Sequence, residues 1–195
     1  MPEGPEVHYL GLVLRGLGMA AQTWGKHLYI YDQDWTFGLS GTVRLDGDGR
    51  LHKVSAGHVP GSVVAGTASF GKGVDFCTGT PDQFREVVHR VFACSKRALG
   101  PLLIDQAHIA GIGVAWGSEV LREAGLAPHV ACNAQAVTDG RLVDALVRVR
   151  DRALATYSAS GLPVAGWYRA LYAVRDMTVY KTGTAMEVSG RTWWT

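Results

Sequence analysis

The sequence has few cysteines, no long apolar run and no excess of charge of either sign. Three cysteines stand at Cys77, Cys94 and Cys132, and none of them lies in CxxC or CxH spacing. This excludes a readable disulfide framework or structural zinc site. No stretch approaches roughly 18 uncharged apolar residues, and the opening MPEGPEVH is acidic where a secretory signal is basic and then apolar. We therefore expect a soluble protein of a reducing, cytoplasmic compartment.

The overall charge does not by itself indicate a polyanionic partner. Lys and Arg total 19 against 17 for Asp and Glu, which gives a net charge of +2. A nucleic-acid partner is not excluded by this sum, because phosphate contacts depend on where cations cluster. With 195 residues, 47% of them hydrophobic, the chain is long enough to bury a sizeable core in one large domain or two small ones.

The first half of the chain predicts a short helix and then an antiparallel β unit. Apolar residues recur at helical spacing over residues 7–17, before a glycine-rich stretch. Residues 28–76 hold the short β-type runs LYIY, WTF, TVRL, SVV and VDF, separated by Gly, Asp and Ser turns. The segment PDQFREVVHRVF then predicts a helix capped by Asp82. A polar hinge over residues 95–100 suggests a domain boundary at residue 97.

The second half predicts two helices and a terminal β-hairpin. One helix runs through SEVLREAG, a longer one covers residues 139–159, and the alternating segment VYKTGTAMEVSGRTWWT forms the hairpin. The long helix has an apolar face, on which Leu142, Leu146, Val149 and Ala153 lie within about 60° of one another. A neighbouring stripe holds Arg141, Arg148 and Arg152, which we interpret from spacing alone as a solvated face with Asp144 and Asp151 nearby.

The opening residues carry the most chemistry. A methionine before proline is a good candidate for removal, which would leave a secondary amine on Pro2. Such an amine titrates at roughly pH 8, so a useful fraction is neutral and nucleophilic. Its attack on an aldehydic or glycosidic carbon gives an iminium, and the nearby carboxylates of Glu3 and Glu6 can exchange protons. N-terminal prolines are common, so this motif alone leaves catalysis open.

Four segments occur in the order found in one protein family: MPEGPEV, WGKHLYI, LLIDQAHIAGIGVAWGSEVLREAGLAPH and VYKTGTAMEVSGRTWW. Through them the chain resembles the formamidopyrimidine-DNA glycosylase and endonuclease VIII (Fpg/Nei) family of bifunctional DNA repair enzymes. The PEGPEV start is more similar to the endonuclease VIII branch. The resemblance implies an α+β fold: a reduced N-terminal catalytic β-sandwich with an N-terminal helix (1–97), a helix-two-turns-helix DNA-binding domain (98–178) and a zincless terminal β-hairpin (179–195).

The resemblance also implies an activity and its catalytic residues. The chain would excise a damaged, oxidised base from double-stranded DNA and cleave the abasic (AP) site by β- or β,δ-elimination, with neither metal nor organic cofactor. Pro2 would form a Schiff base with C1′, and Glu3 would act as general acid and base. Glu6 would support the site, and Lys26 would contact a phosphate near the lesion. From the residues alone, Glu6 is equally a helix N-terminal carboxylate and Lys26 a solvated strand-end charge.

Further DNA contacts follow from the resemblance. Gly111 and Gly113 would let backbone amides approach phosphates, and Arg191 of the terminal hairpin would bind phosphate. Leu39 stands where a side chain replaces the extruded base, although an ordinary buried leucine fits equally well. Of the later wedge motif only Phe70 is retained.

The sequence also departs from the family pattern. Only GLGMAAQTW separates the first helix from the lysine strand, so either strands of the sandwich are missing or a second subunit, as in a homodimer, covers the sheet. Val114 replaces a phosphate-binding asparagine and has no side-chain donor. Ala185 and Val188 occupy zinc-ligand positions, so no zinc is expected. Packing of Trp193 and Trp194 would then hold the hairpin.

Two alternatives stay open at this stage. One is a catalytically impaired DNA-binding protein that keeps the scaffold, and the other is an N-glycosidase redirected to an unusual modified base or nucleoside. In each case the resemblance places the protein in the cytoplasm, associated with the nucleoid of a bacterium or with a phage.

Overall fold

The computed structural model describes most of the chain, including Glu3, Glu6, Lys26 and Arg191 of the predicted site. Pro2, Leu39, Phe70 and the predicted strand SVV lie outside the described residues. None of the helices in the part of the chain that the structure describes is long and apolar enough to cross a membrane. The described residues are 3–16, 18, 20–30, 35–37, 43–45, 51–53, 72–159 and 175–195.

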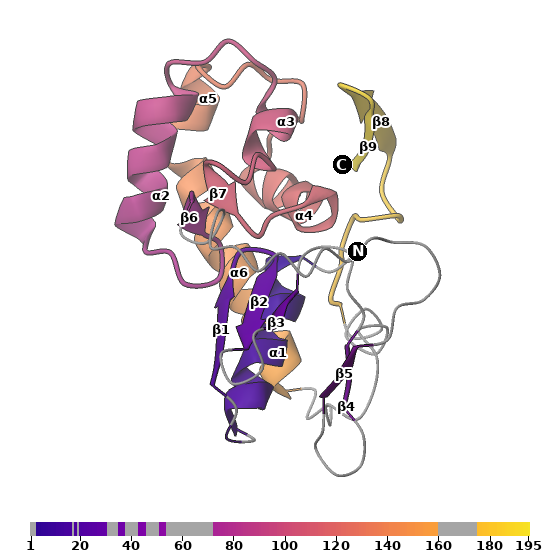
Figure 1. Ribbon diagram of the computed structural model, residues 1–195. Helices are drawn as coiled ribbons and strands as arrows, with labels where there is room; N and C mark the ends of the chain where they lie inside the picture. The colour runs from indigo at the N-terminus through magenta and orange to yellow at the C-terminus, as the bar shows by residue number, and fades with distance from the viewer. Residues whose placement is uncertain are drawn as a thin grey trace.

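The N-terminal part combines one helix with small antiparallel sheets. Helix α1 (Gly4–Gly16) lies against strands β1 (Ala21–Trp24) and β2 (His27–Ile30), as Figure 1 shows in indigo. The helix begins three residues before the predicted start, because Pro5 suits a first helical turn. The sheet order is β1-β2-β3, with β3 at Trp35–Phe37.

A second, separate antiparallel pair follows: β4 (Val43–Leu45) and β5 (Leu51–Lys53). The runs LYIY, WTF and TVRL therefore contribute antiparallel strands as predicted. The run VDF does not belong to this unit. Its strand β6 (Val74–Asp75) pairs in parallel with β7 (Ile109–Ala110). In this pairing the Val74 amide donates to the carbonyl of His108 over 2.9 Å.

The helix after the sheets has a different cap from the one predicted. Helix α2 (Pro81–Val87) has Thr80 as its N-cap. The Thr80 hydroxyl accepts the Gln83 amide over 3.2 Å, while the Gln83 side chain accepts the Thr80 amide over 2.8 Å. This reciprocal pair satisfies two free amides at once, which Asp82 inside the first turn does not do. The helix continues as a π-helical turn, η2 (Val88–Phe92).

The remaining helices form the largest part of the core. Helices α4 (Val114–Ala124) and α6 (Arg141–Ala159) pack against each other, and α6 also contacts α1 and α2. The division at residues 97 and 178 stays a prediction; α2 and α6 pack together across it. Short helices α3 (Leu99–Leu103) and α5 (Gln135–Thr138) complete this layer. The predicted apolar face of α6 is confirmed: Leu142, Leu146, Val149 and Ala153 are fully buried.

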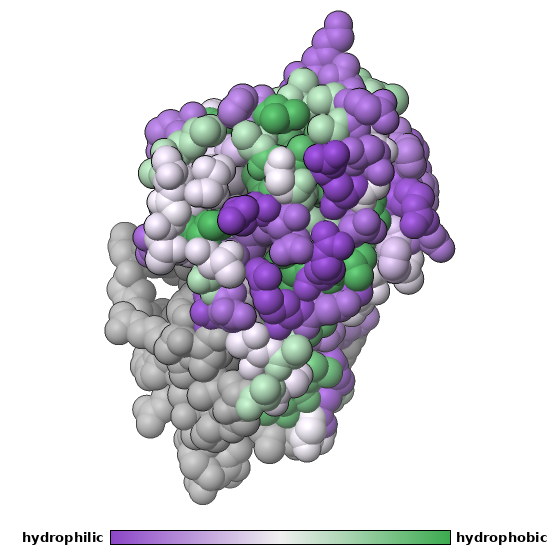
Figure 2. All heavy atoms as spheres, turned by 180° about the vertical axis from the view of Figure 1, so that it is seen from behind, coloured by the Kyte–Doolittle hydropathy of each residue, from purple (hydrophilic) through white to green (hydrophobic). Residues whose placement is uncertain are grey.

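Two arginines of the α6 stripe pair with a neighbouring helix, whereas Arg141 pairs with Asp139 just before α6. Arg148 Nε lies 2.8 Å from a Glu123 carboxylate oxygen, and Arg152 lies 3.3 Å from Glu119. Both glutamates belong to α4, so the partners differ from the aspartates of α6 that the spacing suggested. Hydrophilic side chains predominate over α2 and α6 on the face seen from behind (Figure 2).

A two-stranded antiparallel hairpin, drawn in yellow in Figure 1, ends the chain: β8 (Ala185–Val188) and β9 (Arg191–Trp194). Ser189 and Gly190 between them have positive φ angles of 53° and 71°, as a type I′ turn requires. Trp193 is fully buried, and a Cβ added at Gly100 would lie 2.8 Å from its ring. Trp193 therefore packs into the core, while the prediction that packing of Trp193 and Trp194 replaces a zinc site stays a prediction.

Candidate active site

The N-terminal segment crosses the loop before α4 at two glycines. The Gly4 amide donates to the Gly111 carbonyl over 2.7 Å, and a Cβ on Gly4 would lie 3.0 Å from Gly111 Cα. Gly111 has a φ of 102°, which side chains disfavour. The crossing brings Glu3 to the N-terminus of α4, a helix whose own cap residue, Gly113, has no side chain.

The Glu3 carboxylate takes the place of that missing cap. It accepts the backbone amides of Gly113 (2.8 Å), Ala115 (3.1 Å) and Trp116 (3.2 Å). The helix dipole adds positive potential at this end of α4. Glu3 is only 7% exposed. A Cβ on Gly113 would collide with this carboxylate and come within 2.9 Å of Lys26 Nζ, so only glycine fits between the two.

Lys26 lies in the β1–β2 turn and faces the same carboxylate. Burial lowers the pKa of Lys26, the Glu3 charge raises it, and nearby Arg191 lowers it further, with a net decrease. Burial raises the pKa of Glu3, Lys26 lowers it and Glu6 raises it, with a net increase. Burial is the largest cause of both shifts, since it disfavours the charged form of each group. Lys26 is thus half-buried, not the solvated strand-end charge of the alternative interpretation.

Glu6 is the fully buried centre of a hydrogen-bond network. One of its oxygens accepts the Glu3 amide over 2.7 Å, consistent with a helix N-terminal carboxylate. The other accepts Trp116 Nε1 (3.1 Å), the Tyr157 hydroxyl (2.6 Å) and Arg175 Nε (2.7 Å). Burial lowers the pKa of Arg175, but the charge and hydrogen bond of Glu6, together with Glu3 and Tyr157, raise it, with a net increase. Glu6 therefore ties α1 to α4, to α6 and to the segment before the hairpin.

Sequence reasoning missed the three side-chain partners of Glu6. They stand 110, 151 and 169 positions away along the chain. A buried carboxylate requires donors, but no local pattern indicates which of the many tryptophans, tyrosines and arginines supplies them.

Asp75 is a further residue that the sequence did not single out. Its carboxylate accepts the Gly25 amide of the β1–β2 turn and, at its other oxygen, the amides of Cys77 (2.8 Å) and Thr78 (2.9 Å). Asp75 is 4% exposed. It therefore fixes the turn that carries Lys26.

Glu119 holds the segment that leads to the hairpin. Its carboxylate accepts the backbone amides of Thr178 (2.9 Å), Val179 (2.8 Å) and Tyr180 (3.0 Å), and the Thr178 hydroxyl (2.5 Å). Arg152 approaches the same carboxylate to 3.3 Å. Together with Trp193, this carboxylate sets the position of β9 and hence of Arg191.

The structure brings Glu3, Glu6, Lys26 and Gly113 together, with Arg191 near Lys26. The amide of Gly111 donates to Gln106 Oε1 over 2.9 Å, and that of Gly113 donates to Glu3. Phosphate binding by these two glycines stays a prediction. In the described part of the chain, no group of three or more His, Cys, Asp and Glu residues is placed to hold a metal ion.

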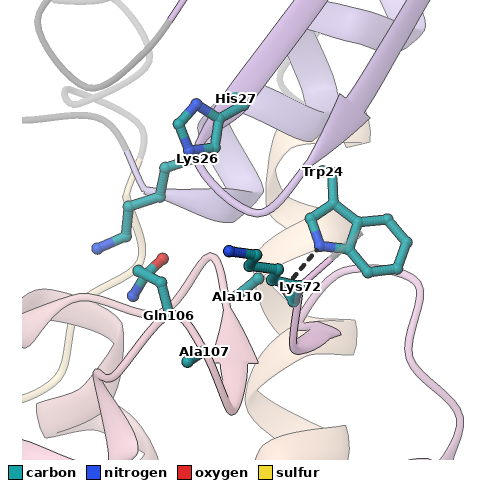
Figure 3. Close-up of a pocket in the computed structure, with 7 residues that line it drawn as sticks. All are labelled: Trp24, Lys26, His27, Lys72, Gln106, Ala107 and Ala110. Carbon is teal, nitrogen blue, oxygen red and sulfur yellow. Dashed lines mark hydrogen bonds between the residues drawn. The ribbon is translucent and has the colours of Figure 1, made fainter. Parts of the chain in front are cut away.

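A small cavity has Lys26 in its lining (Figure 3). Its volume is about 120 Å³. The lining comes from the end of β1, the β1–β2 turn with the first residue of β2, the segment before β6, and the loop before β7 with the last residue of β7. The lining residues are Trp24, Lys26, His27, Lys72, Gln106, Ala107 and Ala110.

Comparison with known proteins connects this geometry to one fold. No protein-family model matches the chain, and no curated protein matches it significantly. Among solved structures, the MutM (Fpg) protein of Thermus thermophilus matches with a TM-score of 0.69 and 19% identity, over 99% of this chain and 96% of that chain.

Two further matches are structures that contain DNA. The Lactococcus lactis formamidopyrimidine-DNA glycosylase, non-covalently bound to AP-site DNA, has a TM-score of 0.69 and 16% identity, covering 98% of this chain and 97% of that chain. A MutM complex with DNA containing carbocyclic 8-oxo-G has a TM-score of 0.67 and 17% identity, over 99% and 97%. The chain thus has the fold of formamidopyrimidine-DNA glycosylases.

Proposed function

We propose that the protein is a DNA glycosylase with AP lyase activity, a shortened and zincless relative of the Fpg/Nei enzymes on the endonuclease VIII side. The observation that carries the proposal is the buried Glu3 carboxylate, which follows Pro2 in sequence, caps α4 and faces Lys26. Solved structures with this fold hold AP-site and 8-oxo-G DNA, which supports damaged DNA as the substrate.

The chemistry assigned to these residues begins at the amine of Pro2 once Met1 is removed. The amine attacks C1′ of an extruded nucleotide, and the C1′–N bond to the base breaks with its electron pair leaving on the base. The departing base takes up a proton from water, and the attacking nitrogen, now an ammonium, gives its proton to Glu3. Opening of the C1′–O4′ bond then gives the iminium, and Glu3 passes this proton on to O4′. Loss of a C2′ proton expels the 3′-phosphate by β-elimination.

Lys26 and Arg191 have the roles of cations in this proposal. Both are positively charged groups beside the reacting carboxylate, and phosphates of a bound strand would pair with them. Each neutralised phosphate adds roughly 0.9 to the slope of log affinity against log salt. The charge of Arg191 repels that of Lys26 and so lowers the pKa of Lys26. A bound phosphate would offset this repulsion.

The test is borohydride trapping on a duplex with one abasic site, with confirmed removal of Met1. Reduction of the iminium should give a covalent protein–DNA adduct that peptide mapping assigns to Pro2. The variant Pro2→Gly keeps an amine but makes it primary, so any remaining adduct should map to the substituted N-terminal residue and form at a changed rate. Good duplex binding without any adduct would overturn the lyase assignment in favour of a DNA-binding protein.

A further inference from the structure

The cavity beside Lys26 has dimensions that limit its occupant. Its volume of about 120 Å³ equals that of about four water molecules at roughly 30 Å³ each. Pockets for drug-sized ligands start at about 300 Å³. The space therefore suits one small group, such as a phosphate with part of its sugar.

The charged groups of the lining are all cationic. Lys26 and Lys72 both contribute, and Figure 3 shows the two side chains extending in the same direction above the loop that carries Gln106 and Ala107. The charge of Lys26 interacts with the Glu3 carboxylate. Lys72 is exposed and forms no ion pair with any carboxylate of the described residues. One uncompensated ammonium group therefore stands at the rim of the cavity.

The remaining walls are rigid and largely apolar. Trp24 Nε1 donates to the Lys72 carbonyl over 3.0 Å, which fixes the Lys72 backbone to the end of β1. Gln106 donates to the carbonyls of Ile104 (2.7 Å) and Ile112 (2.8 Å), so its amide shapes the loop and is not free for a ligand. The floor consists of the methyl groups of Ala107 and Ala110 and the indole of Trp24.

We propose that this cavity is a second phosphate subsite, which takes one sugar–phosphate unit of the bound DNA strand next to the nucleotide at Glu3. The inference rests on the proposed function, because it takes the strand to lie across Lys26. The phosphate pairs with the ammonium groups of Lys72 and Lys26, and the deoxyribose packs on Trp24 and Ala107. Phosphate contacts of this kind position a strand without reading its sequence.

The first test measures the salt dependence of binding to a duplex that holds a stable abasic-site analogue. Loss of one phosphate contact in Lys72→Ala should lower the slope of log affinity against log salt by about 0.9. The matched control is Lys96→Ala, an exposed lysine in the loop after η2, outside the cavity; its slope should equal that of the wild type. Equal slopes for both variants and the wild type would overturn the subsite.

The second test locates the phosphate. Each phosphate of the damaged strand is replaced in turn by a neutral methylphosphonate. At one position beside the lesion, the neutral group should cost the wild type more affinity than it costs Lys72→Ala, because only the contact with Lys26 is left to lose in the variant. If no position shows this non-additivity, the assignment is wrong.

A free phosphate ion shares the chemistry of a DNA phosphate, so a third arm separates the two sources. Inorganic phosphate replaces chloride at equal ionic strength. If phosphate weakens DNA binding only when Lys72 is present, and the salt slope of Lys72→Ala is reduced, the strand occupies the cavity. If Lys72→Ala loses phosphate binding but keeps the wild-type DNA slope, the cavity is a free-anion site and the DNA subsite is overturned.

Trapping distinguishes failure of this inference from failure of the proposed function. If the wild type forms an adduct at Pro2 but Lys72→Ala and Lys96→Ala have the same salt slope, the lyase assignment stands and the subsite is overturned. The reduced slope without any wild-type adduct retains the subsite as a DNA contact and removes the lyase.

Discussion

Two buried glutamates in this molecule each accept three backbone amides, yet their surroundings differ. Glu3 accepts amides from the start of α4, and Glu119 accepts amides from the segment before the hairpin. Glu119 pairs with Arg152, a guanidinium that keeps its proton at any physiological pH. Glu3 instead faces Lys26, whose pKa is lowered by burial. The same acceptor geometry thus pairs one carboxylate with a permanently charged guanidinium and the other with an ammonium group whose pKa is lowered.

Glu6 lies between these two cases. It is as buried as Glu119 and pairs with the guanidinium of Arg175, but it also accepts the amide of Glu3. A structural carboxylate therefore stands directly behind the one to which we assign chemistry. Substitutions at each of these carboxylates or at its partners should therefore separate loss of catalysis from loss of stability.

The largest expected effect is on the rate of strand cleavage in Glu3→Gln. Glutamine keeps the shape and accepts amides at its one oxygen, but it cannot transfer a proton, so cleavage at an abasic site should slow by about 10²–10⁴-fold. Single-turnover kinetics on an abasic-site duplex measure the rate. Glu86→Gln, on the exposed face of α2, serves as control. An unchanged rate in Glu3→Gln would remove Glu3 from the chemistry.

Arg175→Met should cause the largest loss of stability. It leaves the fully buried Glu6 carboxylate without its cation, and breaking a buried pair in this way costs about 3–5 kcal/mol. Urea unfolding measures the free energy of unfolding. The matched control is Arg122→Met on the exposed side of α4, which should change it by less than about 0.5 kcal/mol. Similar losses in the two variants would show that Arg175 does not neutralise Glu6.

Glu119→Ala should destabilise the protein by about 3 kcal/mol, because the amides before the hairpin and Arg152 lose a shared acceptor. The loss should appear first in the tryptophan fluorescence of the hairpin, where Trp193 is buried. Glu123→Ala removes the exposed partner of Arg148 and should cost less than about 1 kcal/mol. Equal losses of unfolding free energy in the two variants would contradict the role of Glu119 in holding the segment before the hairpin.

The smallest expected effect is a pH dependence of stability. The folded state raises the pKa of Glu3 above its ordinary value of 4.5, so the folded protein binds this proton more tightly than the unfolded chain. The contribution of Glu3 to the free energy of unfolding should therefore fall as the pH rises from 4.5 through the raised pKa. Comparing wild type with Glu3→Gln over this window isolates the contribution, and parallel curves would contradict the sign.

Local patterns predicted much of the fold. The apolar period of 3.6 residues identified α6 within two residues of its start, and alternation with a two-residue turn identified the hairpin of β8 and β9. The predicted cap of α2 was wrong, because a capping box at Thr80 competes successfully with Asp82. Such signals depend on neighbours a few residues apart, which a sequence displays directly.

The sequence by itself determined which residue types lie at the site: Glu3 and Glu6 in the opening motif, and Lys26 at the end of a strand. Only the tertiary structure decided what those groups do to one another. The parallel pairing of β6 with β7, the cap that Glu3 places on α4 and the donors around Glu6 all join distant parts of the chain. Burial and charge pairing set the pKa of each group through these contacts, and no period or spacing in the sequence encodes them.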